Sequence, residues 1–121
     1  MNLEDGLILG AGVLAHVGIL ANRYIVRPKL KNKKYSEISI QVEHVLHHVA
    51  QTLMFNVIFK NFPGTESLEN MPYKSMIASF GAGLYVDGII PQIKDGRPQL
   101  DQITSNSVGV LMGGGIIKYL L

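Results

Sequence analysis

Four apolar segments constrain the fold of this chain more than any other feature of its sequence. Residues 6–22 carry no charged side chain, and further apolar stretches lie within 38–59, 73–91 and 102–120. Each is close to the roughly 20 residues that a helix needs to cross a bilayer. Four crossings would leave only about 40 positions for three connections and the ends. The sequence therefore predicts an all-α, four-helix polytopic membrane protein, a single domain with helices at about 6–26, 38–59, 73–91 and 102–120.

Composition leaves a soluble alternative open. Charged residues make up 17% of the 121 residues, below the usual share for soluble domains, but the mean hydropathy of +0.22 is low for a polytopic protein. A soluble bundle of four buried helices, or a chain that inserts conditionally, would have the same composition. The absence of Cys excludes a disulfide scaffold, and the apolar content excludes intrinsic disorder.

The first connection is strongly basic and predicts an orientation. It carries six Lys and Arg residues before the first acidic one, Glu37. Short basic loops normally stay in the cytoplasm, which predicts an N-out, C-out protein with residues 61–73 outside and 94–101 inside. A nucleic-acid patch is the alternative, but the position between two apolar segments favours a topology signal. Because the opening MNLED has no basic residue, we expect a retained anchor rather than a cleaved signal peptide.

Glycines occur inside the apolar segments. Gly6 and Gly10 are four residues apart, as are Gly109 and Gly113. In a soluble helix each would cost about 1 kcal/mol relative to Ala, whereas in lipid small residues at this spacing allow close helix contact. We therefore predict helix packing at these four positions, although Gly is also simply common in membrane helices.

The second segment holds the main concentration of polar chemistry. At 100° per residue, five polar side chains fall within an arc of about 140° on one helix face. They are Glu43, His44, His47, His48 and Gln51, and we call them the polar stripe. Ionisable residues in a membrane segment usually face the bundle interior or a water-filled cavity and are functional candidates.

Three interpretations of the polar stripe remain open. It could be a seam that hydrogen-bonds other helices, or it could bind a headgroup or transfer protons, because His titrates near neutral pH. The pair His44 and His48 could also bind a metal, with Glu43 or Asp101 completing the set. The order does not match the H-E-x-x-H zinc motif, and we predict no metal and no cofactor. His16, alone in the first segment, is expected to be a satisfied interior histidine.

Polar residues also surround the third connection. Asp87 interrupts an apolar run, and a buried carboxylate needs a partner. Arg97 is the expected cation, unless Asp87 lies at the membrane surface. Asp101 could cap the last helix, and Asn106 follows one to two turns later. The candidate ligand-binding residues are thus Glu43, His44, His47, His48, Asp87, Arg97, Asp101 and Asn106.

Two motifs resemble those of the VanZ-like and YfiM-like small membrane proteins. The run EHVLHHVAQTLM is similar to their D-K-x-x-H-F opening, with Glu43 and His47 in the acidic and histidine positions. The run GRPQLDQITSNSVGVLMGG is similar to their closing G-R…D…N-x-x-G-x-x-x-G element. The matching residues there are Gly96, Arg97, Asn106, Gly109 and Gly113. The resemblance covers residues 42–121 and implies a four-helix protein of the cell envelope, linked in some members to glycopeptide resistance and in some relatives to phages.

The sequence leads to two functional hypotheses. The first is a VanZ-like envelope protein of the bacterial cytoplasmic membrane that engages a lipid or lipid-linked headgroup. Glu43 and His47 would act as hydrogen-bond or proton partners, and Arg97 would pair with an anion. The second is an oligomeric pore-forming or structural membrane component, such as a phage holin-like or virion ejection protein. Membrane lipid is the expected partner, a homo-oligomer is compatible with both hypotheses, nucleic acid is not expected, and no enzyme activity is assigned.

Overall fold

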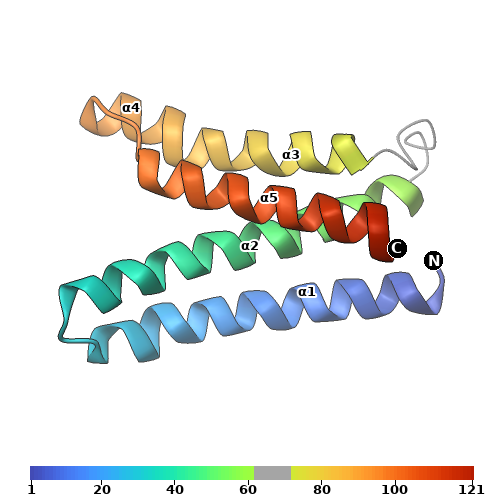
Figure 1. Cartoon of the computed structure of the whole chain (residues 1–121), viewed down its shortest axis with the longest axis horizontal. Helices are drawn as coiled ribbons and strands as arrows, with labels where there is room; N and C mark the ends of the chain where they lie inside the picture. Colours follow the sequence, from blue (N-terminus) through green and yellow to red (C-terminus); the bar gives the residue numbers. More distant parts are fainter. Residues whose placement is uncertain (62–71) are drawn as a thin grey trace.

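The computed structural model describes residues 1–61 and 72–121, and all regular structure in these ranges is helical. The helices of the described residues form four rods, as the sequence predicted, and Figure 1 shows how they are arranged. The first is α1 (Leu3–Ala21), continued by the π-helical turn η1 (Asn22–Val26) and the 3-10 turn η2 (Arg27–Lys29). The second is α2 (Lys33–Asn61). The third combines α3 (Pro72–Leu84), the π-helical turn η4 (Tyr85–Ile89) and α4 (Ile90–Asp95), and the fourth is α5 (Leu100–Leu120). Most of the predicted outer connection, residues 61–73, falls outside the described residues.

Local sequence explains where these rods begin and end. Asn2 caps α1 by accepting a hydrogen bond from the Asp5 N–H at 2.8 Å. Pro28 lies in η2 and has no N–H with which to continue the helical hydrogen bonds, and the backbone becomes extended two residues later at Leu30. Gly96 ends α4 with φ of 77°, a left-handed conformation that favours glycine.

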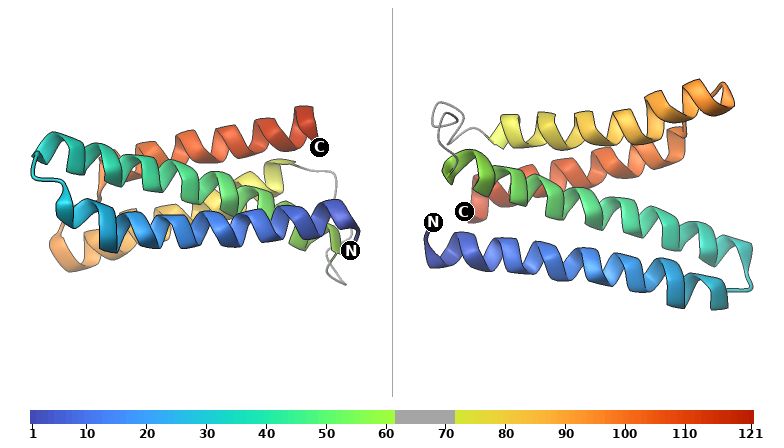
Figure 2. Two further views of the ribbon diagram at one scale, coloured as in Figure 1. Left: turned by 90° about the horizontal axis from the view of Figure 1, so that it is seen from below. Right: turned by 180° about the vertical axis from the view of Figure 1, so that it is seen from behind.

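The central helix of the bundle is α2, which packs against α1, α3 and α5. Successive rods run antiparallel, so both termini lie at one end and η1, η2 and α4 lie at the other (Figure 1). The view from behind in Figure 2 shows α2 between α1 and α3. These two outer helices pack on α2 and make little contact with each other.

Glycines bring α5 close to α2. A Cβ added at Gly109 would overlap the backbone oxygen of Val45 and lie 2.9 Å from the Cβ of His48. A Cβ at Gly113 would lie 2.8 Å from the Cβ of Thr52. Any larger residue at these two positions would force the helices apart, as expected for small residues at a helix interface.

The other glycine pair does not pack. A Cβ added at Gly6 or Gly10 would meet no described atom within 4 Å. The close approach on α1 occurs instead at Gly12, where a Cβ would lie 2.8 Å from the Cγ of Met54. The prediction of packing at Gly6 and Gly10 was therefore wrong within this chain, because their face of α1 points away from α2.

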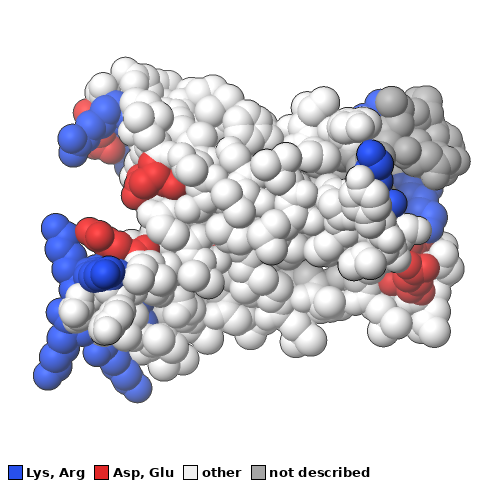
Figure 3. Space-filling view, in the orientation of Figure 1, with Lys and Arg blue, Asp and Glu red and all other residues white. Residues whose placement is uncertain are grey.

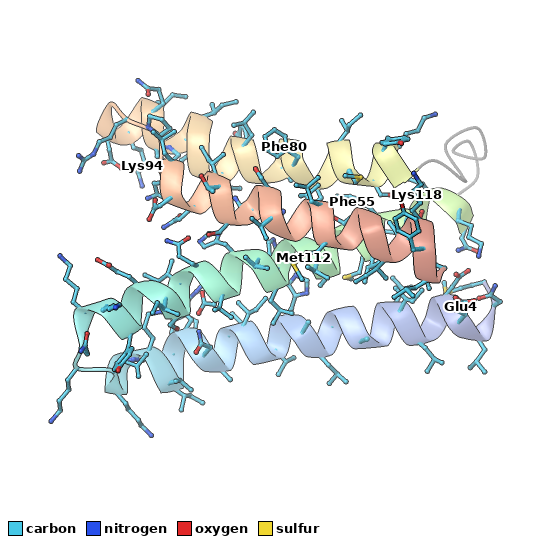
Figure 4. The ribbon with its side chains drawn as sticks, viewed as in Figure 1. Glu4, Phe55, Phe80, Lys94, Met112 and Lys118 are labelled. Atoms are coloured by element: carbon cyan, nitrogen blue, oxygen red, sulfur yellow. The ribbon has the colours of Figure 1, made fainter. Side chains whose placement is uncertain are left out.

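The interior of the bundle is mainly polar, whereas its surface is apolar. Among the described residues, five apolar side chains are classed as buried, compared with eight polar or charged ones. The polar ones are Asp5, Glu43, His48, Thr52, Ser75, Ser79, Asp87 and Asn106. Large apolar side chains are exposed along all four rods. Figure 3 shows charged residues at the two ends, separated on that face by a wide uncharged belt, and Figure 4 places Glu4 and Lys118 at one end and Lys94 at the other.

Two of the rods are long and apolar enough to cross a membrane. They are Leu3–Lys29 and Tyr73–Asp95, and only 17% and 28% of their most apolar windows are buried. Such low burial differs from that of a core helix in a soluble bundle. Over the described residues, α2 and α5 are not apolar enough to count as candidate membrane spans by composition. In α2 the polar stripe is one reason.

Candidate functional site

A cavity of about 170 Å³ lies beside the polar stripe, between the first, second and third rods. All five residues of the stripe line it. The other lining residues are Ile19 and Arg23 from the first rod and Ala82, Gly83, Val86 and Asp87 from the third. The stripe therefore faces the bundle interior, where the sequence predicted it.

Glu43 forms one charged wall of the cavity. Glu43 as a whole is 4% exposed. Its carboxylate forms one ion pair with Arg27 and a second with the Nη2 of Arg23, at 3.5 Å. Asn22 donates its side-chain N–H groups to Glu43 Oε1 at 2.9 Å and to Ser39 at 2.7 Å. The buried Nε of Arg27 has no hydrogen-bond partner within the described part of the chain. Two guanidinium groups for one carboxylate make this wall net positive.

Asp87 forms the other charged wall and is 5% exposed. Asn106 on α5 donates its amide N–H to Asp87 Oδ2 at 2.6 Å. The Nδ1 of His44 is 2.9 Å from Asn106 Oδ1 and 3.5 Å from Asp87 Oδ2. The backbone oxygen of Asp87 also accepts from the Gln99 N–H at 2.8 Å, which ties the third rod to the start of α5. In residues 1–61 and 72–121, no Lys or Arg pairs with Asp87, so this wall is negative when His44 is neutral.

Two π-helical turns carry the charged walls. Arg23 and Asn22 lie in η1, and Asp87 lies in η4. A π-helical turn contains one extra residue, which changes the direction of its side chains relative to a regular helix, and such turns are frequent at functional sites. Both lie toward the same end of the bundle, on the rods that flank α2 (Figure 1).

Histidines connect α1 and α3 to α2 across the cavity. His16 donates from Nδ1 to the backbone oxygen of Gly12 at 2.7 Å, and its Nε2 is 2.9 Å from the Nδ1 of His47. His48 is buried, with Nδ1 at 3.0 Å from the Ser79 hydroxyl on α3. His16, expected to be a satisfied interior histidine, is hydrogen-bonded through both ring nitrogens and thus belongs to this network.

Gly83 provides the space that the buried polar groups occupy. A Cβ at this position would lie 2.7 Å from His48 Cε1 and 2.9 Å from Asn106 Nδ2. A side chain at Gly83 would therefore displace His48 or Asn106 and reshape the cavity.

Two predicted site residues lie outside this cavity. Arg97 is exposed and forms no ion pair with Asp87, whose hydrogen-bond partners are Asn106 and Gln99 instead. Asp101 lies in the first turn of α5, with Gln99 at the cap position, and accepts from Gln41 on α2 at 3.0 Å. The prediction of an Asp87–Arg97 pair was therefore wrong. The chain turns at Gly96, after α4 has ended, and Arg97 lies exposed just beyond this turn.

The structure does not support a metal interpretation of the histidines. Among the described residues, no three side chains of His, Cys, Asp or Glu are arranged to hold a metal ion. His44 and His48, the histidines of the metal interpretation, donate from Nδ1 to Asn106 and Ser79 respectively, and their Nε2 atoms have no hydrogen-bond partner among the described residues.

Several residues that complete the site from outside α2 are not among the candidates predicted from the sequence. Asn22, Arg23, Arg27 and Ser79 were not singled out, and the two arginines were assigned to topology alone. Their spacing was an available signal, because residues four apart share a helix face. The extra residue of η1 was not visible in the sequence.

No family model, curated protein or solved structure matches this chain. The resemblance to VanZ-like proteins therefore rests on the two motifs, and function must follow from the chemistry of the cavity.

Proposed function

We propose that this chain is a four-helix membrane protein that binds the headgroup of a lipid or lipid-linked molecule in the cavity beside the polar stripe. One observation carries the proposal. Polar and charged groups are buried between helices whose outer surfaces are apolar. Extended apolar surfaces are uncommon on soluble monomers, whereas lipid solvates them well. Ionisable groups within a membrane usually face the interior and mark a binding or transport site.

The position of the cavity supports access from the lipid phase. It is lined by Ile19 and Arg23 on one side and by Ala82 and Val86 on the other. Because α1 and α3 make little contact with each other, we infer that the cavity opens to the lipid phase between these side chains. A lipid could insert its headgroup between the two helices while its acyl chains remain in the bilayer.

The size of the cavity suits a headgroup. Each water occupies about 30 Å³ in the liquid, so about 170 Å³ corresponds to a handful of waters or one small polar group. An entire lipid would not fit. The binding energy would come from the charged walls, because charge-assisted hydrogen bonds are about twice as strong as those between neutral groups.

The charge distribution supports the predicted orientation. Eight of the eleven Lys and Arg residues lie between Arg23 and Lys34 or between Lys94 and Arg97, at the end of the bundle that holds η1 and α4. We propose that this end faces the cytoplasm of a bacterial cell, with both termini outside. We also propose that the chain is a member of the VanZ-like group. In support, the motif residues Glu43 and His47 line the cavity, and the motif residue Asn106 is hydrogen-bonded to His44, which also lines it.

The arrangement favours headgroup binding over the oligomeric pore of the second hypothesis. In a pore assembled from several copies, the polar stripe would face a shared lumen. Here α1 and α3 of the same chain cover the stripe, and its side chains bond within that chain. A single copy is sufficient to form the cavity.

Lipid retention by purified protein tests the proposal. After a carbonate wash has established membrane integration, the protein is purified in mild detergent and its bound lipids are counted by native mass spectrometry. Arg23→Gln and His47→Ala should each reduce the retained lipid by about tenfold, the effect of losing one charge-assisted interaction. Arg97→Gln removes the same charge outside the cavity and should have no effect. Equal retention in all variants, at equal thermal stability, would refute headgroup binding in this cavity.

A further inference from the structure

The hydrogen-bond network determines which nitrogen of each histidine carries the hydrogen. A backbone oxygen can only accept, so His16 donates from Nδ1 to Gly12 and, when neutral, presents Nε2 as an acceptor. His47 must then donate from its own Nδ1 to His16. The Nε2 of His47 is left as an acceptor without a partner among the described residues.

The same logic applies to the other two histidines of the stripe. Asn106 donates its N–H to Asp87, so its oxygen accepts from the Nδ1 of His44. Ser79 donates its single hydroxyl hydrogen to Gln51, so its oxygen accepts from the Nδ1 of His48. Each neutral imidazole therefore carries its hydrogen on Nδ1. All three histidines that line the cavity have an Nε2 acceptor with no hydrogen bond from residues 1–61 or 72–121.

The cavity is also bipolar. Its Glu43 wall is net positive, because both Arg23 and Arg27 pair with this single carboxylate. Its Asp87 wall carries a carboxylate with no Lys or Arg partner within the described ranges. Surplus donors thus lie at one wall, and surplus acceptors lie at the other wall and on the histidines between them.

We propose that the cavity recognises a phosphodiester that carries a primary ammonium group, the chemistry of a phosphoethanolamine headgroup. This inference rests on the proposed headgroup binding and names its ligand class. The phosphate lies toward Arg23, and the ammonium group lies toward Asp87, with its three N–H donors available to the carboxylate and to the Nε2 acceptors. The ligand thereby pairs with the half-exposed Arg23 guanidinium at one wall. At the other wall it gives partners to the buried Asp87 carboxylate and to the Nε2 acceptors, which would otherwise be costly to leave without partners.

The lining residues discriminate against two related headgroups. A choline headgroup has the same charges but no N–H donor, and proteins usually bind its quaternary ammonium on the faces of aromatic residues. No Phe, Tyr or Trp is among the lining residues described for this cavity. A glycerol headgroup has donors but no positive charge for Asp87.

A methylation series on the wild-type protein tests the inference without relying on a variant that might misfold. Delipidated protein is titrated in detergent with phosphatidylethanolamine, its N-methyl and N,N-dimethyl derivatives, phosphatidylcholine and phosphatidylglycerol, and bound lipid is measured by native mass spectrometry. Each methyl group replaces one N–H donor while the positive charge is retained. We expect a stepwise fall in affinity that reaches about tenfold or more at phosphatidylcholine. Equal affinity for the ethanolamine and choline lipids would overturn the inference.

Two variants locate the preference, and a soluble competitor identifies the source of the headgroup. Asp87→Asn should abolish the preference for ethanolamine over choline lipid, whereas Asp95→Asn, at an exposed position outside the cavity, should retain it. A preference that survives in a folded Asp87→Asn protein would overturn the inference. Displacement of the lipid by glycerophosphoethanolamine would support recognition of the headgroup alone, and resistance to displacement with the preference intact would support recognition of the intact lipid.

The two proposals fail in different ways. If all lipids bind equally and Arg23→Gln weakens all of them, headgroup binding stands and ammonium recognition is refuted. If no lipid binds to the wild-type protein, both proposals are refuted.

Discussion

The close packing of α5 on α2 can be tested with two identical substitutions that are expected to act in opposite directions. Gly109→Ala introduces a methyl group that overlaps the backbone oxygen of Val45 and lies 2.9 Å from His48 Cβ. Backbone and a buried Cβ cannot move aside as the end of a flexible side chain can. Relief therefore requires α5 to move away from α2. Gly10→Ala introduces the same methyl group where no described atom lies within 4 Å.

The magnitude follows from packing and from helix propensity. Overpacking typically costs 1–3 kcal/mol, and a backbone obstacle places Gly109→Ala near the upper end, at about 3 kcal/mol. The better helix propensity of Ala offsets up to about 1 kcal/mol, which leaves a net loss of about 2 kcal/mol. Gly10→Ala has the propensity term alone and should be neutral or stabilising by up to about 1 kcal/mol.

Thermal unfolding in detergent micelles, followed by far-ultraviolet circular dichroism at a single scan rate, would measure the difference. A loss of about 2 kcal/mol should lower the unfolding midpoint by about 8 °C for a chain of this size. Gly10→Ala should match or exceed the wild-type midpoint. The reasoning would be refuted if the two variants had the same midpoint, because the helix contact would then not determine stability.

Three further predictions follow from the polar contacts. Gly83→Ala should displace His48 and weaken lipid binding about tenfold, measured by native mass spectrometry, and unchanged binding would show that the cavity tolerates a side chain there. Glu43→Gln should lower the free energy of unfolding by about 2 kcal/mol, measured by thermal unfolding. This is less than the loss for a fully buried pair, because one of the two guanidinium partners of Glu43 is 46% exposed. An unchanged midpoint would contradict this value. Lys60→Met removes the cation 3.3 Å from buried Asp5. Because the Lys60 side chain is 46% exposed, the loss of unfolding free energy should stay below about 1 kcal/mol. A larger loss in the same assay would show that the pair is effectively desolvated.

Much of the fold could be predicted because it depends on local chemistry. The apolar runs are sufficient to locate the ends of the rods to within about five residues, and Pro28 and Gly96 lie where the first and third rods end. The inward direction of the polar stripe was also predictable, since its five polar residues share one helix face and most of the other residues between 42 and 59 are apolar.

The partners of the stripe could not be predicted in the same way. Arg97 is the cation that the sequence predicts for Asp87, across the turn that follows it. In the structure Asp87 is hydrogen-bonded to Asn106, and Arg23 is the cation that lines the cavity. Both differences depend on how separate rods pack and on the extra residue in η1 and η4, neither of which leaves a periodic signal in the sequence. Packing also distinguished Gly109, which contacts α2, from Gly10, which does not.

The sequence by itself determined that four helices form, that their outer faces are apolar, and that Glu43 and the histidines lie on one face of the second helix, because these properties depend on residue type and helical period. Only the tertiary structure decided that Asp87 and Arg23 lie on opposite walls of one cavity and that the Nε2 atoms of His44, His47 and His48 are left as acceptors. The physical reason is that a hydrogen bond between helices requires both partners within about 3 Å, and that distance is set by packing of whole rods rather than by the order of residues along any one of them.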